Sequence, residues 1–141
     1  MITITVYICK TQNTHMKSII NTISAPSPIG PYSQGVLAGN TLYVSGQIAI
    51  NPENGKMVQQ TIAQEAKQIM LNIEAVLNEA GMGFEHIVKT SIFLKNIGDF
   101  SAVNEVYSTY FTGNFPARET VEVAKLPKEA NVEISVIAVK I

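Results

Sequence analysis

The segment between Thr61 and Gly83 has the strongest local pattern in the chain, because apolar and polar residues separate onto two faces at helical spacing. Thr61 and Gln64 match a capping box, which pairs two otherwise free backbone donors at a helix start, and Gly81 favours a helix end. The polar side chains expected to face solvent are Glu65, Lys67, Gln68, Asn72 and Glu79. A helix with one apolar face has to pack on another layer, here a sheet.

Strand patterns lie on both sides of this helix. Gly39-Asn40 between two β-like runs is typical of a tight two-residue turn and predicts a hairpin over residues 34–47. A second helix is predicted to begin after Gly98-Asp99, with an apolar stripe of Phe100, Val103, Tyr107, Tyr110 and Phe111. The remaining strands are predicted over residues 17–21, 88–95, 119–124 and 132–140. This order predicts an α+β fold, a two-layer sandwich in which one mixed β-sheet carries two helices on one face.

A chain of 141 residues can bury one ordinary core and not two, so we expect a single domain. Residues 1–9 alternate as a strand does but lack the basic start and the cleavage site of a signal peptide. Met16-Lys17-Ser18 is a more natural beginning, so residues 1–15 are interpreted as an extension outside the core fold and residues 16–141 as the domain. The only cysteine, Cys9, fits a reducing compartment, and a cytoplasmic protein is expected.

The composition of the chain limits the kinds of partner it is expected to bind. The chain is 46% hydrophobic and 15% charged, and with no further element to cover the second face of the sheet, neighbouring subunits are the expected cover. Net charge is −1 and the lysines are scattered singly, so nucleic acid is not an expected partner. No apolar run is long enough to span a bilayer. His15 and His86 lack ligand-spaced partners, so no metal is expected.

Two charged residues could carry chemistry. Arg118 follows a proline at the start of a strand, where an arginine is either solvated, paired with a surface carboxylate, or a planar fork that grips a small carboxylate. Glu133 lies between two apolar strand residues. It is either an ordinary outward-facing carboxylate or, if it points into a cleft between subunits, a partly desolvated general base.

Four further residues have both a structural and a functional interpretation. Tyr32 follows a stiff Gly-Pro step and is either packing or a rigid pocket wall with a polar tip. Gly46 either bends the end of a strand or allows a ligand to approach the backbone closely. Ser45 and Asn104 are weak signals on their own, and a structural role is open for each.

Several ordered motifs resemble those of the Rid/YjgF family, also called the L-PSP endoribonuclease family. They are IGPYSQG, VSGQI, DFSAVNEVY, and FPAR followed by VEVAKLPKEANVEI. The resemblance covers residues 16–141 and implies a chorismate-mutase-like fold, a homotrimer and active sites between its subunits. It further implies a 2-iminobutanoate/2-iminopropanoate deaminase, which hydrolyses enamine and imine products of pyridoxal-phosphate-dependent dehydratases to 2-keto acids and ammonia. No cofactor or metal is implied.

The resemblance also assigns roles. Arg118 resembles the family's carboxylate clamp, and Glu133 resembles the residue that positions or activates water. The residues that resemble the substrate-binding positions are Tyr32, Ser45, Gly46, Asn104 and the backbone amide of Thr120. Many family members have cysteine where this chain has Thr120, so a thiol cannot be essential here, and Glu119 adds a negative charge of unknown direction beside the clamp.

Two other functions remain open at this point. The family's ribonuclease label suggests RNA cleavage, which the near-neutral charge disfavours. A non-catalytic metabolite-binding protein could use the same carboxylate-binding cleft. Turnover separates these alternatives, because a binding protein would hold 2-keto acids without accelerating imine hydrolysis.

Overall fold

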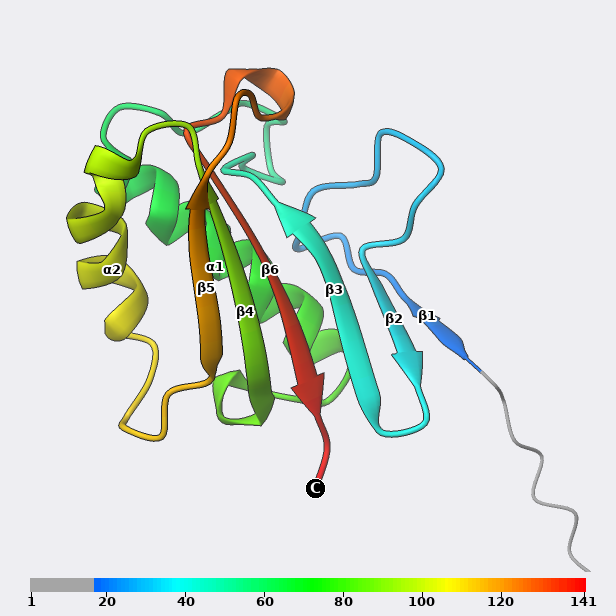
Figure 1. Ribbon diagram of the computed structural model, residues 1–141. Coiled ribbons are helices and arrows are strands. Elements are labelled where there is room, and N and C mark those ends of the chain that lie inside the picture. Colours follow the sequence, from blue (N-terminus) through cyan, green and yellow to red (C-terminus); the bar gives the residue numbers. More distant parts are fainter. Residues whose placement is uncertain (1–16) are drawn as a thin grey trace, which may run out of the picture.

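The computed structural model of the chain describes residues 17–141, which form one six-stranded sheet with two α-helices (Figure 1). The extension predicted over residues 1–15 lies outside the described residues. The strands are β1 (Ser18–Ile20), β2 (Gly35–Ala38), β3 (Thr41–Gln47), β4 (Ile87–Leu94), β5 (Ala117–Glu122) and β6 (Val132–Val139). The helices are α1 (Ile62–Glu79) and α2 (Phe100–Ser108), and the short 3-10 turns are η1 (Phe84–His86), η2 (Ile97–Asp99) and η3 (Pro127–Glu129).

The sheet is mixed, as predicted, with the order β1-β2-β3-β6-β4-β5. All neighbours pair antiparallel except β4 and β5, which are parallel and are connected through α2. β2 and β3 form the predicted hairpin, and Gly39 at its turn has the positive φ that such a turn requires. The C-terminal strand β6 lies between β3 and β4, and its second half, from Val136 to Val139, is apolar on both faces, as expected of a central strand.

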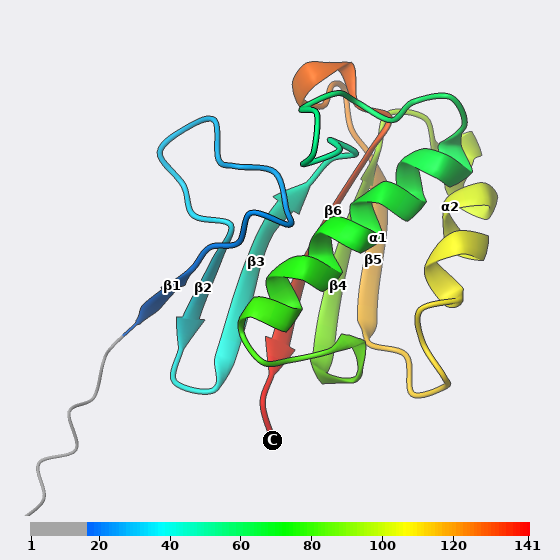
Figure 2. The ribbon, with the colours of Figure 1, turned by 180° about the vertical axis from the view of Figure 1, so that it is seen from behind.

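Both helices lie on one face of the sheet, with α1 across its middle and α2 beside the edge strand β5 (Figure 2). The predicted capping of α1 is confirmed, because Thr61 Oγ1 accepts a hydrogen bond of 3.1 Å from the Gln64 N–H. The second helix is shorter than its apolar stripe suggested and ends at Ser108. Tyr110 and Phe111 therefore follow the helix, where Tyr110 packs against the ring of Phe84.

Two polar residues of α1 are buried, which corrects the expectation that they face solvent. The Glu65 carboxylate is fully buried and accepts hydrogen bonds from the backbone N–H and the side-chain amide of Asn131, at 2.8 and 2.9 Å. The buried Asn72 amide donates to the carbonyls of Ile48 and Ile50. Helical periodicity alone predicts that every polar side chain of a helix faces solvent. Here, however, backbone groups of the loops next to the sheet are buried against α1, and buried backbone groups need polar partners.

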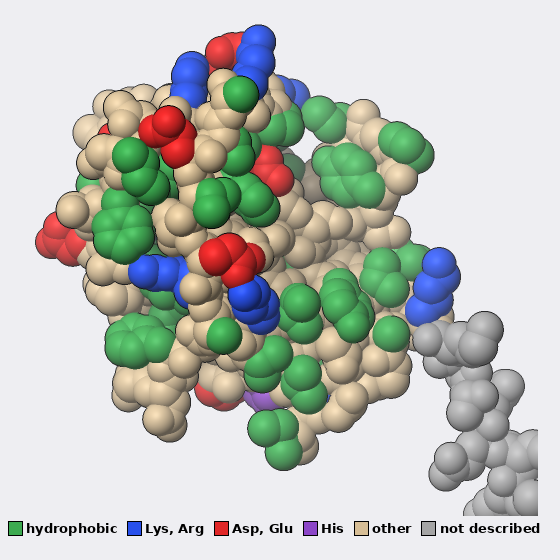
Figure 3. All heavy atoms as spheres, viewed as in Figure 1, with side chains coloured by type: hydrophobic (Ala, Val, Ile, Leu, Met, Phe, Trp, Pro, Cys, Tyr) green, Lys and Arg blue, Asp and Glu red, His purple; other side chains and the backbone are tan. Residues whose placement is uncertain are grey.

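The other face of the sheet is open, because no helix of residues 17–141 crosses it (Figure 1). The paired residues in one row across this face are Ile19, Val36, Tyr43, Ile137 and Lys89. Hydrophobic side chains gather over β2 and β3, and a cluster of charge lies at the centre of the face (Figure 3). None of the helices in the described part of the chain is long and apolar enough to cross a bilayer.

Candidate active site

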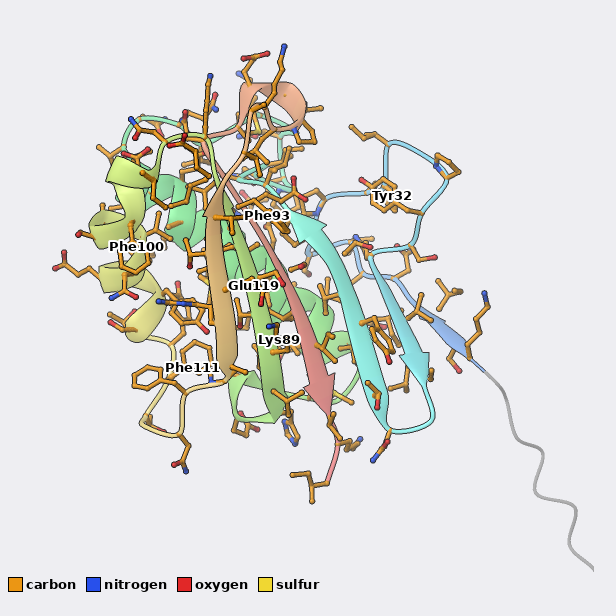
Figure 4. The ribbon with its side chains drawn as sticks, viewed as in Figure 1. Tyr32, Lys89, Phe93, Phe100, Phe111 and Glu119 are labelled. Carbon is orange, nitrogen blue, oxygen red and sulfur yellow. The ribbon has the colours of Figure 1, made fainter. Side chains whose placement is uncertain are left out.

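The proline-rich loop before β2 is held in place by one buried amide. Gln34 donates from Nε2 to the carbonyls of Ala25 and Pro26, at 3.1 and 2.9 Å, and its Oε1 accepts from the N–H of Thr22 at 2.7 Å. Because Gln34 satisfies backbone groups across the loop, the loop keeps one shape and presents Tyr32, which projects beside the open face (Figure 4). Sequence reasoning did not single out Gln34, since its partners lie 8 to 12 residues away.

This loop and the ends of β3 and β6 enclose a cavity of about 450 Å³. Its lining includes Tyr32, Ser45, Gly46 and Glu133, and the rest of the wall is mostly apolar. The space-filling view shows the surface hollowed between the loop and the sheet (Figure 3). We call these four residues the Glu133 half-site.

Gly46 leaves room for the Glu133 carboxylate. A Cβ at position 46 would lie 2.1 Å from Glu133 Oε1, so any side chain there would displace the carboxylate. The β3–β6 register is irregular between Val44 and Gln47, where Gly46 lies. The Glu133 carboxylate has no hydrogen-bond or ion-pair partner among residues 17–141, and burial raises the pKa of this carboxyl group. An unpaired carboxylate of raised pKa in a cavity is a suitable general base.

Ser45 supports the loop rather than offering its hydroxyl group to the cavity. Its Oγ donates to the Ser33 carbonyl, and its N–H donates to the Gln34 carbonyl at 3.0 Å. Both hydrogen-bond donors of Ser45, its hydroxyl group and its backbone N–H, are therefore used to hold the loop.

Arg118 lies on the opposite, helix-covered side of β5. Its Nη1 donates to Asn104 Oδ1 at 2.8 Å, and its guanidinium carbon lies 5.6 Å from the ring centre of Phe100 and 4.9 Å from that of Tyr107. No carboxylate of residues 17–141 pairs with it, so it is not the surface ion pair that the sequence left open. Arg118, Asn104, Tyr107 and Phe115, which we call the Arg118 half-site, line a cavity of about 390 Å³.

Glu119 points away from Arg118, onto the open face. There it pairs with Lys89 and accepts a hydrogen bond from Ser91, and the three groups form the charged centre of that face (Figures 3 and 4). Lys89, and after it Ser91, holds the pKa of the Glu119 carboxyl group below its usual range. The negative charge of Glu119 is therefore on the other side of the sheet from the guanidinium.

Thr120 lies on the same side of β5 as Arg118, and its Oγ1 is buried without a partner in the described part of the chain. Val123 donates its N–H to the Leu94 carbonyl of β4. N–H groups alternate in direction along a strand, so counting back from Val123 places the Thr120 N–H at the free edge of the sheet. This backbone donor is available to a ligand at that edge.

The two half-sites of one chain do not meet. Glu133 pairs with Phe93 on the open face, whereas Arg118 pairs with Thr90 on the helix-covered face. β4 separates their strands, and at about 4.8 Å per strand spacing β5 lies roughly 10 Å from β6. A small ligand cannot contact both residues within one chain. No group of three or more metal-ligating side chains occurs among residues 17–141.

Known proteins resemble this chain in both sequence and fold. Residues 22–140 match the family model described as Endoribonuclease L-PSP. A rat protein named 2-iminobutanoate/2-iminopropanoate deaminase is 48% identical over 125 residues, which cover 89% of this chain and 91% of the rat protein. A protein of the conserved Rid family from Yersinia pestis has a TM-score of 0.86 and 53% identity, over 88% of this chain and 99% of that one. The structure of E. coli TdcF with bound serine has a TM-score of 0.85 and 37% identity, over 88% and 99%. The matched residues include both half-sites.

Proposed function

The chain belongs to the endoribonuclease L-PSP family, also known as Rid/YjgF, and from this premise we propose that it is a deaminase that hydrolyses 2-imino acids to 2-keto acids and ammonia. The small substrates 2-iminobutanoate and 2-iminopropanoate are proposed from the name of the rat relative at 48% identity. The supporting observation is the Arg118 guanidinium, which is held by an amide and two rings and lacks a carboxylate partner among residues 17–141. Such a fork suits the carboxylate of an α-substituted acid.

The active site is completed between two copies of the chain. The carboxylate carbon of a 2-imino acid is bonded directly to the carbon that water attacks, so Arg118 and Glu133 must come within a few atoms of each other. They lie on opposite faces of one sheet, so a neighbouring subunit must supply the second half-site. The open face, with exposed Tyr43 and Val121, is the surface proposed to be covered in a homotrimer.

The imine is already reactive, so the main task of the enzyme is to position the substrate and the attacking water. The carboxylate of the substrate binds the free edge of the Arg118 guanidinium, and the Thr120 N–H is the second donor for that end of the molecule. Serine bound to the relative TdcF also carries a carboxylate, which is consistent with an amino-acid-like ligand in this family.

Glu133 then acts as the general base and general acid of the reaction. Its carboxylate accepts a proton from a water molecule as the water oxygen attacks C2, and the C=N double bond becomes a single bond in a carbinolamine. Glu133 passes this proton to nitrogen, which completes the carbinolamine. It then accepts the proton of the C2 hydroxyl group and transfers it to nitrogen as well, so the C–N bond breaks, ammonia leaves, and the C2 oxygen becomes the carbonyl of the 2-keto acid. No oxidant, cofactor or covalent bond to the protein is needed for this balance.

RNA cleavage, which the name of the endoribonuclease L-PSP family suggests, is the less favoured alternative. The net charge of −1 offers little attraction to a phosphate backbone, and the lysines do not form a stripe in the sequence. Arg118 itself lies against Phe100 and Tyr107 with one amino group on Asn104, which leaves an edge suited to one small anion.

The direct test is a turnover assay. An amino-acid oxidase or dehydratase generates 2-iminobutanoate and other imino acids in situ, and ammonia and 2-keto acid release is followed with and without the protein. We expect catalysed release, and light scattering should give about three chain masses for the active species. Binding of 2-oxobutanoate without acceleration would favour the metabolite-binding alternative, and cleavage of RNA that co-elutes with the protein and is lost in Arg118→Ala would favour the ribonuclease.

A further inference from the structure

The Arg118 side chain lies between two aromatic rings of the same helix. Phe100 and Tyr107 are seven residues apart on α2, which separates them by about 10.5 Å along its axis. The guanidinium carbon lies 5.6 Å from one ring centre and 4.9 Å from the other, and Asn104, between them on the helix, accepts from Nη1. Phe100 extends from α2 at the edge of the sheet (Figure 4). The guanidinium is therefore held along one stripe of α2.

Unlike Phe100, Tyr107 is buried and is held by a hydrogen bond from its hydroxyl group to the sheet. It is 3% exposed, and its hydroxyl group donates to Oγ1 of the fully buried Thr90 at 3.1 Å. Thr90 is the residue of β4 that pairs in register with Arg118 on β5. Phe111 packs against the same ring with 4.8 Å between ring centres. Thr90, which lies beside Arg118 in the sheet, thus holds the Tyr107 ring that Arg118 contacts.

We propose that Tyr107 is a positioning residue for the carboxylate clamp, and that Thr90 locks its ring so that Arg118 presents one free edge of its guanidinium to the substrate. This inference rests on the proposed function only for its kinetic consequence. An arginine side chain has many rotamers, and a ligand that has to select one of them binds more weakly. A stacked guanidinium whose plane is set before binding avoids that loss. Tyr107 acts on the substrate through Arg118.

A purely structural Tyr107 would stabilise the core without affecting Arg118. The two roles can be separated because Arg118 is the only arginine in the chain. Protein labelled with ¹⁵N-arginine therefore gives the guanidinium signals of this one residue in an NMR spectrum. A guanidinium held by Asn104 and two rings rotates slowly about its C–N bonds, so we expect separate Nη signals in the wild-type protein.

Four variants form the test. Tyr107→Leu removes the ring, Tyr107→Phe keeps the ring and loses the hydrogen bond to Thr90, and Phe100→Leu removes the partly exposed second ring. Tyr110→Leu is the matched control, because it removes a tyrosine that packs on Phe84, at 5.0 Å between ring centres. Ligand binding is measured with 2-oxobutanoate, and turnover with 2-iminobutanoate.

In Tyr107→Leu we expect the Nη signals to merge and KM to rise about tenfold, with kcat within about threefold of wild type. Tyr107→Phe should recover most of that loss, and Phe100→Leu should raise KM by about threefold. Tyr110→Leu should keep separate Nη signals and a KM within about twofold of wild type. If Tyr107→Leu does not fold, Phe100→Leu decides the question, since it keeps the buried core: an unchanged KM would then overturn the positioning of Arg118 by the two rings.

Separate Nη signals and unchanged KM in a folded Tyr107→Leu protein would overturn the proposal. The same holds if the signals merge equally in Tyr110→Leu, because a general loosening of the core would then explain both. If the wild-type protein turns over no 2-imino acid but its Nη signals still merge in Tyr107→Leu alone, the positioning role stands and the proposed function fails.

Discussion

Replacing Arg118 by alanine should lower kcat/KM for 2-iminobutanoate by about 100- to 1,000-fold, because each charge-assisted hydrogen bond to the carboxylate contributes about 1.5 to 3 kcal/mol. Arg118→Lys keeps the positive charge but replaces a planar fork with a single ammonium group, and the expected loss is about ten- to a hundredfold. The measurement is steady-state kinetics on folded protein, with circular dichroism melts for each variant.

Lys67→Ala is the control for Arg118→Ala, since it removes a positive charge from an exposed position on α1 that lines neither half-site. It should keep kcat/KM within about twofold of wild type. Wild-type rates in folded Arg118→Ala and Arg118→Lys assemblies would show that the guanidinium does not bind the substrate.

Glu133→Gln should lower kcat by about 100-fold with little change in the binding of 2-oxobutanoate, because the amide keeps the shape of the side chain but cannot accept a proton. Burial raises the pKa of the Glu133 carboxyl group, so the wild-type rate should fall as the pH drops through that raised pKa and the base becomes protonated. This acid limb of the pH profile should be absent from the residual activity of Glu133→Gln.

The control is Glu79→Gln, which neutralises an exposed carboxylate near the end of α1 and should leave both the rate and its pH profile unchanged. A Glu133→Gln enzyme with normal turnover would reduce Glu133 to a structural residue of the cavity. A reduced rate that keeps the acid limb would instead place the titrating group elsewhere.

The elements of the fold could be predicted from local chemistry, but their arrangement could not. The capping residue Thr61 and the turn at Gly39 act on neighbouring residues, so they are visible in the sequence. The position of β6 between β3 and β4 depends on pairing between residues far apart in the chain, and periodicity contains no such information. Burial of Glu65 was missed for the same reason, because its partner Asn131 is 66 residues away.

The candidate site shows the same division. The motif resemblance singled out Arg118 and Glu133, but alternation along a strand only says that Glu119 and Arg118 face opposite ways. Which of the two faces the helices follows from the pairing of β4 with β5 and from the contact of Arg118 with α2. Gln34 and Tyr107 lie within the quoted motifs, but their roles were missed because each acts through a hydrogen bond to a residue distant in the sequence.

The claim that the active site is shared between subunits can be tested with two inactive variants. Arg118→Ala and Glu133→Gln chains carrying different affinity tags are co-expressed, and two successive affinity steps select the assemblies that contain both. In a cyclic trimer every such assembly has one interface where an intact Arg118 half-site meets an intact Glu133 half-site. We therefore predict about one third of the wild-type turnover per assembly. Mixed assemblies that are as inactive as either parent variant would contradict a site shared between subunits.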